Sequence, residues 1–251
     1  MIKTLLTASS LLLVAMNSSA NALNESQLSC LLEPSQLVEI SSEVPGVIAE
    51  VSGERGRTVK KGQVLLKLSS GVERAALSLA RAKVDFAKRK VKRNQDLFKK
   101  GLLSDHERDE MVTEQRVAEL EVRVALERVK QRAVTSPIDA VVVKRDVSVG
   151  EYVDEKPVMT LASLNPLHAE VILRASQYGQ VEEGMKVTLK AGPQHPEQQA
   201  TVKYVDKVID AASGTFGIRL ELPNPELKIP AGVKCGVDFS VAKLAESQPA
   251  Q

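Results

Sequence analysis

The sequence contains no tryptophan, and aromatic residues make up only 3% of its 251 residues. Any core therefore depends on Val, Leu, Ile and Ala, within an apolar content of 43%. Such side chains suit narrow helix seams and small β-barrels better than a broad aromatic-lined pocket. An excess of one charge is also absent, since 34 basic residues are balanced by 32 acidic ones. The composition gives no general reason to expect nucleic acid or an anionic membrane as the partner.

Motifs for hydrolytic or metal chemistry are absent too. The three histidines, His106, His168 and His195, are isolated, with no HExxH or CxxC spacing. No serine lies in a nucleophile elbow, and the acidic residues are too scattered to suggest a catalytic pair. The five methionines form no cluster that would suit a soft metal. We therefore expect no catalytic residues, no metal site and no cofactor.

Only one long apolar run is present, from Leu5 to Met16, and it falls short of the ~20 residues that span a bilayer. Lys3 precedes the run, and Ala20 and Ala22 place small residues at positions −3 and −1 of a cleavage site. These features are typical of a secretory signal peptide over residues 1–22 and not of an uncleaved anchor. We therefore expect an exported protein.

The predicted mature chain contains two cysteines, Cys30 and Cys235, near its opposite ends. Cys30 is a poor lipoprotein site because it lies well beyond the apolar run and Gln27 occupies the position where a lipobox has Leu. In an oxidising compartment the two thiols can pair if the ends of the chain meet in space. A disulfide and two separately buried thiols are therefore equal alternatives on the sequence alone.

Two stretches of short β-branched runs share one plan. Each of them, Gln36 to Leu68 and Val134 to Leu161, contains a strand, a proline-led turn, a valine-rich strand, a glycine turn and a closing apolar strand. Neither half alone can bury both faces of its strands. The repeat therefore predicts that residues 36–70 and 134–163 complete one small β-domain together.

The segment between these halves, residues 71–133, is predicted to be an α-helical hairpin. From Val72 to Ala133 it contains no proline and only one glycine, Gly101. Ser104 is placed to cap the second helix, with Glu107 at the matching capping-box position. Two antiparallel helices of close to 30 residues would project ~45 Å. The first helix has a heptad seam of Leu77, Ala80, Val84, Ala87, Val91 and Phe98.

The second helix has two apolar stripes. We assign one stripe, formed by Val117, Leu120 and Val124, as the seam toward the first helix. The second stripe predicts that this helix packs against more than one neighbour, and its members are Ala118, Val122, Ala125 and Val129. Residues 72–100 hold ten basic and three acidic residues, whereas 104–133 hold six basic and eight acidic. These opposite balances favour two helices side by side, although exposed pairs contribute little individually.

Beyond the second half, residues 164–242 alternate apolar and polar residues in five or six segments separated by turns. This pattern predicts a small antiparallel β-barrel. Residues 23–35 are expected to form an N-terminal strand or extension that builds little, and residues 243–251 a flexible polar tail. The expected fold is mainly β, with an inserted helical hairpin.

This order resembles the membrane-fusion or periplasmic adaptor family (HlyD/RND-type adaptors) of bacterial tripartite transporters. GVIAEVSGERGRTVKKGQVLLKL and TSPIDAVVVKRDVSVGEYV look like the halves of its lipoyl-like (barrel-sandwich hybrid) domain, and DAASGTFGIRLELPNPELKIPAGVKCGV looks like its barrel. The resemblance implies a subunit that links an inner-membrane transporter, of the RND type in preference to the ABC type, to a TolC-type outer-membrane channel. It also implies a ring, usually a hexamer, and a periplasmic location, with association to the inner membrane only through partner proteins. Longer members continue into a membrane-proximal β-domain, for which little sequence remains beyond residue 242.

One local match concerns the tip of the hairpin. Adaptors that meet a TolC-type channel often have Arg, Leu four residues later and Ser seven after that, and Arg93, Leu97 and Ser104 match across the turn at Gly101. The resemblance implies that these residues dock to the channel, Arg93 by charge-assisted hydrogen bonds and Leu97 as an apolar knob. The simpler alternative is that Ser104 is only a helix cap, Leu97 only a seam residue and Arg93 only a solvated base.

Other classes of function fit the sequence less well. Lipoyl and biotinyl carriers need an acceptor lysine on the turn after the first half, where this chain has Gly71-Val72. The basic run from Lys88 to Arg93 can contact phosphates, but it has no interleaved aromatic residues and the predicted signal directs the protein outside. We therefore expect no nucleic acid partner. A purely structural coiled-coil envelope protein would not need two β-domains.

Overall fold

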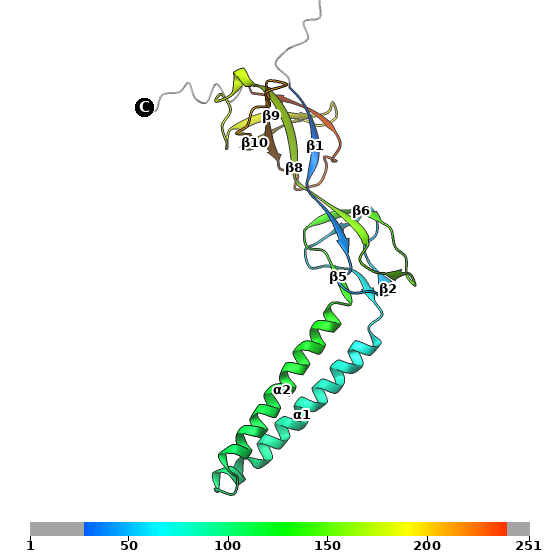
Figure 1. Cartoon of the computed structure of the whole chain (residues 1–251). Helices are drawn as coiled ribbons and strands as arrows, with labels where there is room; N and C mark the ends of the chain where they lie inside the picture. The colour runs from blue at the N-terminus through cyan, green and yellow to red at the C-terminus, as the bar shows by residue number, and fades with distance from the viewer. Residues whose placement is uncertain (1–27, 240–251) are drawn as a thin grey trace, which may run out of the picture.

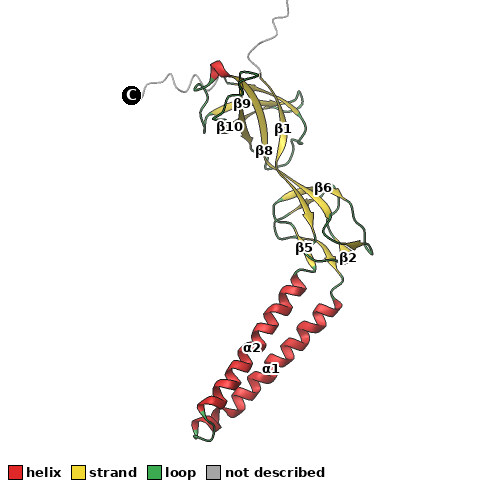
Figure 2. Cartoon of the chain, in the orientation of Figure 1, coloured by secondary structure: helices red, strands yellow, loops and turns green. Residues whose placement is uncertain are grey.

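A computed structural model describes residues 28–239. The predicted signal peptide and the polar tail lie outside the described residues. Figure 1 shows three parts in a row, a β-barrel, a smaller β-domain and a helical hairpin. Figure 2 shows that the two long helices are confined to one end of this elongated molecule.

The elements follow in chain order. The first half of the small β-domain contains the C-terminal part of β1 (Leu28–Ser41), then β2 (Gly46–Val51), β3 (Thr58–Val59) and β4 (Val64–Leu68). The hairpin consists of α1 (Gly71–Lys99) and α2 (Asp105–Lys130). The second half contains β5 (Ala133–Thr135), β6 (Ala140–Arg145), β7 (Tyr152–Val153) and the start of β8 (Pro157–Arg174). The barrel then adds the short 3-10 helix η1 (Ala175–Gln177), β9 (Lys186–Ala191), β10 (Glu197–Val205), β11 (Thr215–Leu222) and β12 (Lys234–Asp238).

The small β-domain is built from two equivalent halves. β2 pairs with β4 in the first half as β6 pairs with β8 in the second. Strands also pair between the halves. β3 of the first half pairs with β6 of the second, and in the equivalent way β7 of the second pairs with β2 of the first. β4 of the first half pairs with β5 of the second, and β8 of the second pairs with β1 of the first. Each half therefore completes the sheets of the other, as the sequence repeat predicts.

Aliphatic side chains from both halves fill the core of this domain. Each of the two closing strands buries three side chains that are at most 1% exposed, Leu65, Leu66 and Leu68 in β4 and Val158, Met159 and Leu161 in β8. The polar groups at the turns are satisfied. The hydroxyls of the buried Ser42 and Ser136 donate to the carbonyls of Val44 and Ile138, each at 2.6 Å.

The hairpin leaves the small β-domain where a carrier domain would have its lysine-bearing turn. α1 begins at Gly71, soon after β4 ends at Leu68, and the chain returns at Ala133 in β5. Gly71-Val72 therefore opens a long helix. No helix between residues 28 and 239 is long and apolar enough to cross a membrane.

The two helices pack along a seam rich in alanine. The buried residues of α1 are Leu77, Ala80, Val84 and Ala87, all of which belong to the predicted heptad seam. The buried residues of α2 are Ala118 and Ala125, and partly buried Val122 and Val129 pack beside them. Small side chains at these positions let the two backbones approach closely.

The predicted seam of the second helix is wrong. Val117, Leu120 and Val124 are 51%, 41% and 55% exposed, and the stripe that contains Ala118 and Ala125 faces α1 instead. The prediction favoured the larger side chains because they are more hydrophobic than alanine. In the seam, however, they would hold the two helices further apart than the alanines do. Three ion pairs also join the helices, Lys83–Glu121 at 2.8 Å, Lys88–Glu119 at 3.4 Å and Lys90–Glu114 at 2.6 Å.

A partly buried ion pair fixes the root of the hairpin. Nη2 of Arg132 lies 2.6 Å from Oε1 of Glu73, and these side chains are only 24% and 16% exposed. Nη1 of Arg132 also donates to the carbonyl oxygen of Pro45 at 2.9 Å, in the turn before β2. Arg132 therefore joins the end of α2, the first turn of α1 and the β-domain.

Removing this ion pair is expected to destabilise the hairpin. Arg132→Ala should lower its free energy of unfolding by about 2 kcal/mol, because Glu73 is left as a partly buried charge without its partner. Thermal melts followed by circular dichroism at 222 nm measure this loss, since the helical signal comes mainly from α1 and α2. Lys130→Ala, which breaks the exposed pair with Glu127, is the matched control and should cost less than about 0.5 kcal/mol. Equal losses in the two variants would contradict the prediction.

The barrel at the other end of the molecule has six strands. Their order is β1-β12-β9-β10-β11-β8, and β8 pairs with β1 to close the sheet. β1 and β8 are long enough to continue into the small β-domain, where they pair again. Figure 1 shows these two strands crossing between the β-domains. The domain boundary predicted between residues 163 and 164 therefore lies within the continuous strand β8.

The N-terminal residues have a larger role than the sequence suggested. Residues 23–35 were expected to build little, yet residues 28–34 form one strand of the barrel wall, between β12 and β8. Leu32 of this strand is fully buried in the barrel core. The barrel needs the first and the last described strands of the chain.

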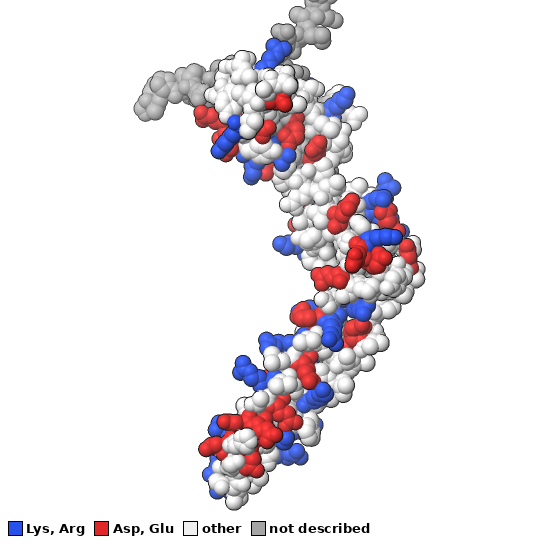
Figure 3. All heavy atoms as spheres, viewed as in Figure 1, with Lys and Arg blue, Asp and Glu red and all other residues white. Residues whose placement is uncertain are grey.

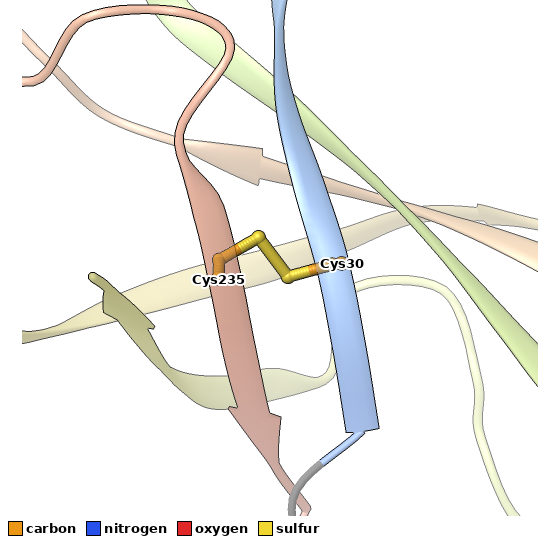
Figure 4. The surroundings of a disulfide bond; sticks show 2 residues. All are labelled: Cys30 and Cys235. Carbon is orange, nitrogen blue, oxygen red and sulfur yellow. A yellow bond between two sulfur atoms is a disulfide. The ribbon is translucent and has the colours of Figure 1, made fainter.

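A disulfide joins those two strands. Cys30 of β1 and Cys235 of β12 lie directly opposite each other, with their Cα atoms 4.8 Å apart, and their sulfur atoms are bonded (Figure 4). The ends of the chain therefore do meet in space. Of the two alternatives left open by the sequence, the structure has the pair.

Candidate docking site at the hairpin tip

The turn between the helices has a defined geometry. α1 ends in a Schellman motif, in which the N–H of Leu102 donates to the carbonyl of Leu97 and the N–H of Gly101 donates to that of Phe98, both at 2.9 Å. Gly101 has φ +71°, a left-handed conformation that a residue with a Cβ adopts only at a cost. The only glycine after Val72 in the hairpin is therefore the residue that lets the chain reverse.

The second helix begins at a complete capping box. The side-chain oxygen of Ser104 accepts from the N–H of Glu107 at 3.2 Å, and a carboxylate oxygen of Glu107 accepts from the N–H of Ser104 at 2.8 Å. The hydroxyl of Ser104 also donates to this carboxylate at 2.7 Å. These hydrogen bonds from Ser104 hold the pKa of Glu107 below its ordinary value of 4.5.

The capping box predicts a pH dependence at the start of α2. Because the pKa of Glu107 is lowered in the folded state, its stabilising contribution is present above pH 4.5 and is lost as pH falls through the lowered value. Ser104→Ala should raise the pKa of Glu107 and reduce the stability of α2 by about 1 kcal/mol. NMR titration of the Glu107 carboxyl carbon measures the shift, with Ser78→Ala as a mid-helix control. An unchanged titration midpoint in Ser104→Ala would contradict this assignment.

Arg93 and Leu97 lie in the last two turns of α1 and point away from the seam. Leu97 is 41% exposed, which excludes the alternative that it is a seam residue. Arg93 is exposed, and its guanidinium has no ion-pair or hydrogen-bond partner among residues 28–239. Ser104 is a helix cap, as the simpler alternative required. The structure thus brings all four predicted tip residues together in the last turns of α1, the turn at Gly101 and the cap of α2.

The tip has further features that the sequence analysis missed. Leu102, directly after Gly101, is 69% exposed and adds a second apolar side chain beside Leu97 in the chain reversal. The guanidinium carbon of Arg108 lies 4.6 Å from the centre of the Phe98 ring, a cation–π contact between the helices. Figure 3 shows acidic side chains gathered near this end of the hairpin. The exposed Leu102 could have been predicted from the sequence, because a Leu that directly follows the glycine of a turn has no helix seam in which to be buried.

Within the described range, no three His, Cys, Asp or Glu side chains lie close enough together to hold a metal ion. The tip of the hairpin carries exposed apolar side chains, Leu97 at 41% and Leu102 at 69%, at the end of a projecting arm. The structure defines the class of the protein by its architecture, a split β-domain with an inserted, projecting hairpin, joined to a second small barrel. The comparisons with known proteins give the family.

A family model described as the CzcB-like, barrel-sandwich hybrid domain matches residues 36–163, just over half of the chain. The chain therefore belongs to this family, that of the periplasmic efflux adaptors or membrane fusion proteins. The matched residues are the small β-domain with its inserted hairpin.

Two curated relatives illustrate the range of the family. The cobalt-zinc-cadmium resistance protein CzcB of Cupriavidus metallidurans is 27% identical over 214 residues, which cover 77% of this chain and 40% of that protein. The solvent efflux pump periplasmic linker SrpA of Pseudomonas putida is 25% identical over 216 residues, which cover 79% of this chain and 56% of that protein. The chain thus spans about half the length of the curated relatives that it matches.

Solved structures share the fold. A MacA-MexA chimeric protein, which contains the Pseudomonas aeruginosa MexA α-hairpin domain, superposes with a TM-score of 0.70 at 19% identity, over 84% of this chain and 78% of that chain. The membrane fusion protein Spr0693 of Streptococcus pneumoniae R6 gives a TM-score of 0.64 at 17% identity, over 84% of this chain and 97% of that chain.

Proposed function

We propose that this chain is the periplasmic adaptor subunit that links an inner-membrane transporter to a TolC-type outer-membrane channel for efflux across the cell envelope. The observation that supports this most directly is the exposed tip of the hairpin, where the Arg93 guanidinium has no ion-pair or hydrogen-bond partner among residues 28–239 and the Leu97 side chain is 41% exposed. A protein that carries exposed apolar and basic side chains at the end of a long arm is suited to contact something distant. In this role the chain performs no chemistry, and the transporter supplies the energy.

The partners follow from the same proposal. The hairpin reaches outward to the tip of the channel, and the barrel faces the transporter, which is of the RND type in preference to the ABC type. The small β-domains of several copies, six in the usual adaptor ring, stack side by side at the base of their hairpins. The relatives named for solvent efflux and for cobalt, zinc and cadmium resistance support export of a toxic compound or ion as the purpose.

Site-specific photocrosslinking in cells that contain the native partners tests the proposal. A photoreactive residue in place of Leu102, which is 69% exposed at the tip, should capture an outer-membrane channel that mass spectrometry identifies. The matched control replaces Val149, which is 63% exposed in the small β-domain and should not capture that protein. Capture of the channel from both positions, or from neither, would contradict docking through the tip.

A further inference from the structure

The exposed apolar side chains of the barrel gather at one end. Within residues 164–239, the large apolar side chains that are exposed are Val208 at 79%, Ile172 at 68%, Tyr178 at 46% and Ile209 at 39%. β8 runs from the small β-domain through the barrel to Arg174, which pairs with Thr215 at the start of β11 (Figure 1). One of the four lies near the end of β8, one directly follows η1, and two lie in the loop that leads into β11. All four therefore lie at the end of the barrel furthest from the hairpin, which we call the distal end.

The loop between β10 and β11 is held by its own hydrogen bonds. A carboxylate oxygen of Asp206 accepts from the N–H of Gly217 at 3.1 Å. A carboxylate oxygen of Asp210 accepts from the N–H groups of Ala212 and Ser213, at 3.0 and 2.7 Å. The two aspartates flank the two exposed apolar residues of the loop, so these bonds fix the loop on both sides of them. The loop therefore presents its apolar side chains outward in a defined conformation.

The charge that this loop presents is positive. Lys207 directly precedes Val208 and is exposed, and its ammonium group has no ion-pair or hydrogen-bond partner among residues 28–239. The two aspartates of the loop are engaged with backbone N–H groups instead. A loop with two aliphatic side chains beside a lysine is complementary to an apolar layer that lies beneath anionic head groups.

The arrangement of the distal end favours a lipid surface over a protein partner. The apolar side chains project from three separate segments, and a protein partner would need a matching pocket for each of them. A fluid lipid layer accepts such side chains without matching pockets. The ring of Tyr178 packs edge-on against Phe216, with the ring centres 5.2 Å apart, and it is the kind of amphipathic ring that is enriched at membrane interfaces.

We propose that the distal end of the barrel inserts Val208 and Ile209 into the periplasmic leaflet of the inner membrane, with Lys207 at the anionic head groups and Tyr178 at the interface. This inference rests on the proposed function, in which the hairpin tip at the opposite end of the elongated molecule reaches the outer membrane (Figure 1). The chain then contacts lipid directly, whereas the family resemblance implies association with the membrane only through partner proteins. Copies in a ring add their contacts, so a weak contact for each chain is sufficient.

A fluorescent probe on the purified full chain tests the insertion. Val208→Cys carries the environment-sensitive dye NBD, while the native cysteines are buried in their disulfide. Vesicles of phosphatidylethanolamine and phosphatidylglycerol should brighten this dye and shift its emission to shorter wavelength, because it enters an apolar layer. The same dye at Val149, which is 63% exposed in the small β-domain, is the matched control and should not respond. No response at position 208, or equal responses at both positions, would overturn the proposal.

Vesicle flotation measures the affinity and its chemistry. Val208→Asp with Ile209→Asp should reduce the fraction of chain bound to these vesicles about tenfold, because a carboxylate is excluded from the apolar layer. Lys207→Glu should weaken binding to these anionic vesicles but not to vesicles of phosphatidylcholine, which have no net charge. Val149→Asp should bind as the natural chain does. Undiminished binding of the double aspartate variant, with the thermal melt of the natural chain, would contradict insertion through this loop.

The two proposals fail in different ways. If the vesicles are not bound while Leu102 still captures the channel in cells, the lipid contact is wrong and the adaptor function stands. If the vesicles are bound but no outer-membrane protein is captured, the chain contacts membranes in another role. In cells, a photoreactive residue at Val208 should gain the mass of a phospholipid. Capture of a transporter at this position, with no lipid adduct, would identify a protein as the occupant and overturn the inference.

Discussion

Replacing Leu97 with aspartate is expected to reduce efflux to the level of cells that lack the protein, while the chain remains folded and exported. Leu97 is 41% exposed and does not belong to the helix seam, so the substitution removes little buried surface. At a docked tip, in contrast, the aspartate would place an unpaired charge in a contact from which water is excluded, at a cost of several kcal/mol. Arg93→Glu should have the same effect, because it reverses a charge that has no partner within the described chain.

The measurement is the resistance of cells to the exported compound, together with the level of the protein in periplasmic extracts and its helical content. Lys92→Glu is the matched control, since Lys92 is exposed, adjacent to Arg93 in sequence and directed toward another side of α1. This control should retain most of the efflux. Full efflux in both the Leu97 and the Arg93 variants would show that the tip assignment is wrong.

The features that were predicted well from the sequence depend on residues near one another in the chain. The capping box needs only Ser104 and Glu107, three residues apart, and the turn between the helices needs only the single glycine at position 101. The internal repeat of the small β-domain was also recognisable, because each half has its own turns. These local signals gave the order of the elements and the position of the tip.

The error on the second helix has a physical cause. Hydrophobic size made Val117, Leu120 and Val124 look like the seam, but the geometry of a close helix pair favours the alanines at 118 and 125. Once the alanines occupy the seam, the larger side chains are left on the surface.

The strand at residues 28–34 was hard to recognise for a different reason. Leu31 and Leu32 are adjacent apolar residues of which only Leu32 is buried, and Pro34 precedes an irregularity in the pairing with β8. The alternation that signals a strand is therefore obscured. Its partners β8 and β12 lie far along the chain, so only the folded topology shows that the barrel is closed by this segment.

Removing the disulfide between Cys30 and Cys235 is expected to lower the stability of the barrel by about 4 kcal/mol. The two cysteines are 205 residues apart in sequence, and in the chain-entropy model a longer loop gives a larger stabilisation. If the barrel unfolds while the small β-domain stays folded, the loop that the disulfide closes in the unfolded barrel is shorter than 205 residues. The reason is that the parts of β1 and β8 that belong to the small β-domain remain paired and hold the chain together there. We therefore expect the loss of unfolding free energy to be smaller than the chain-entropy model gives for a loop of the full sequence separation. The loss is still large in comparison with the total stability of a small domain.

Two optical probes separate this loss from changes elsewhere. Tyr178 and Tyr204 lie in the barrel and are two of the three tyrosines in a chain without tryptophan, so tyrosine fluorescence reports mainly on the barrel. Circular dichroism at 222 nm reports mainly on the hairpin. In the Cys30→Ala, Cys235→Ala double variant, the tyrosine transition should move to a markedly lower temperature while the helical transition stays. Since these are the chain's only cysteines, dithiothreitol should reproduce the shift in the natural protein and leave the double variant unchanged. A barrel transition that neither change moves would contradict the stabilising role, and the closure of the barrel by β1 would then depend on its hydrogen bonds and on apolar side chains such as Leu28 and Leu32.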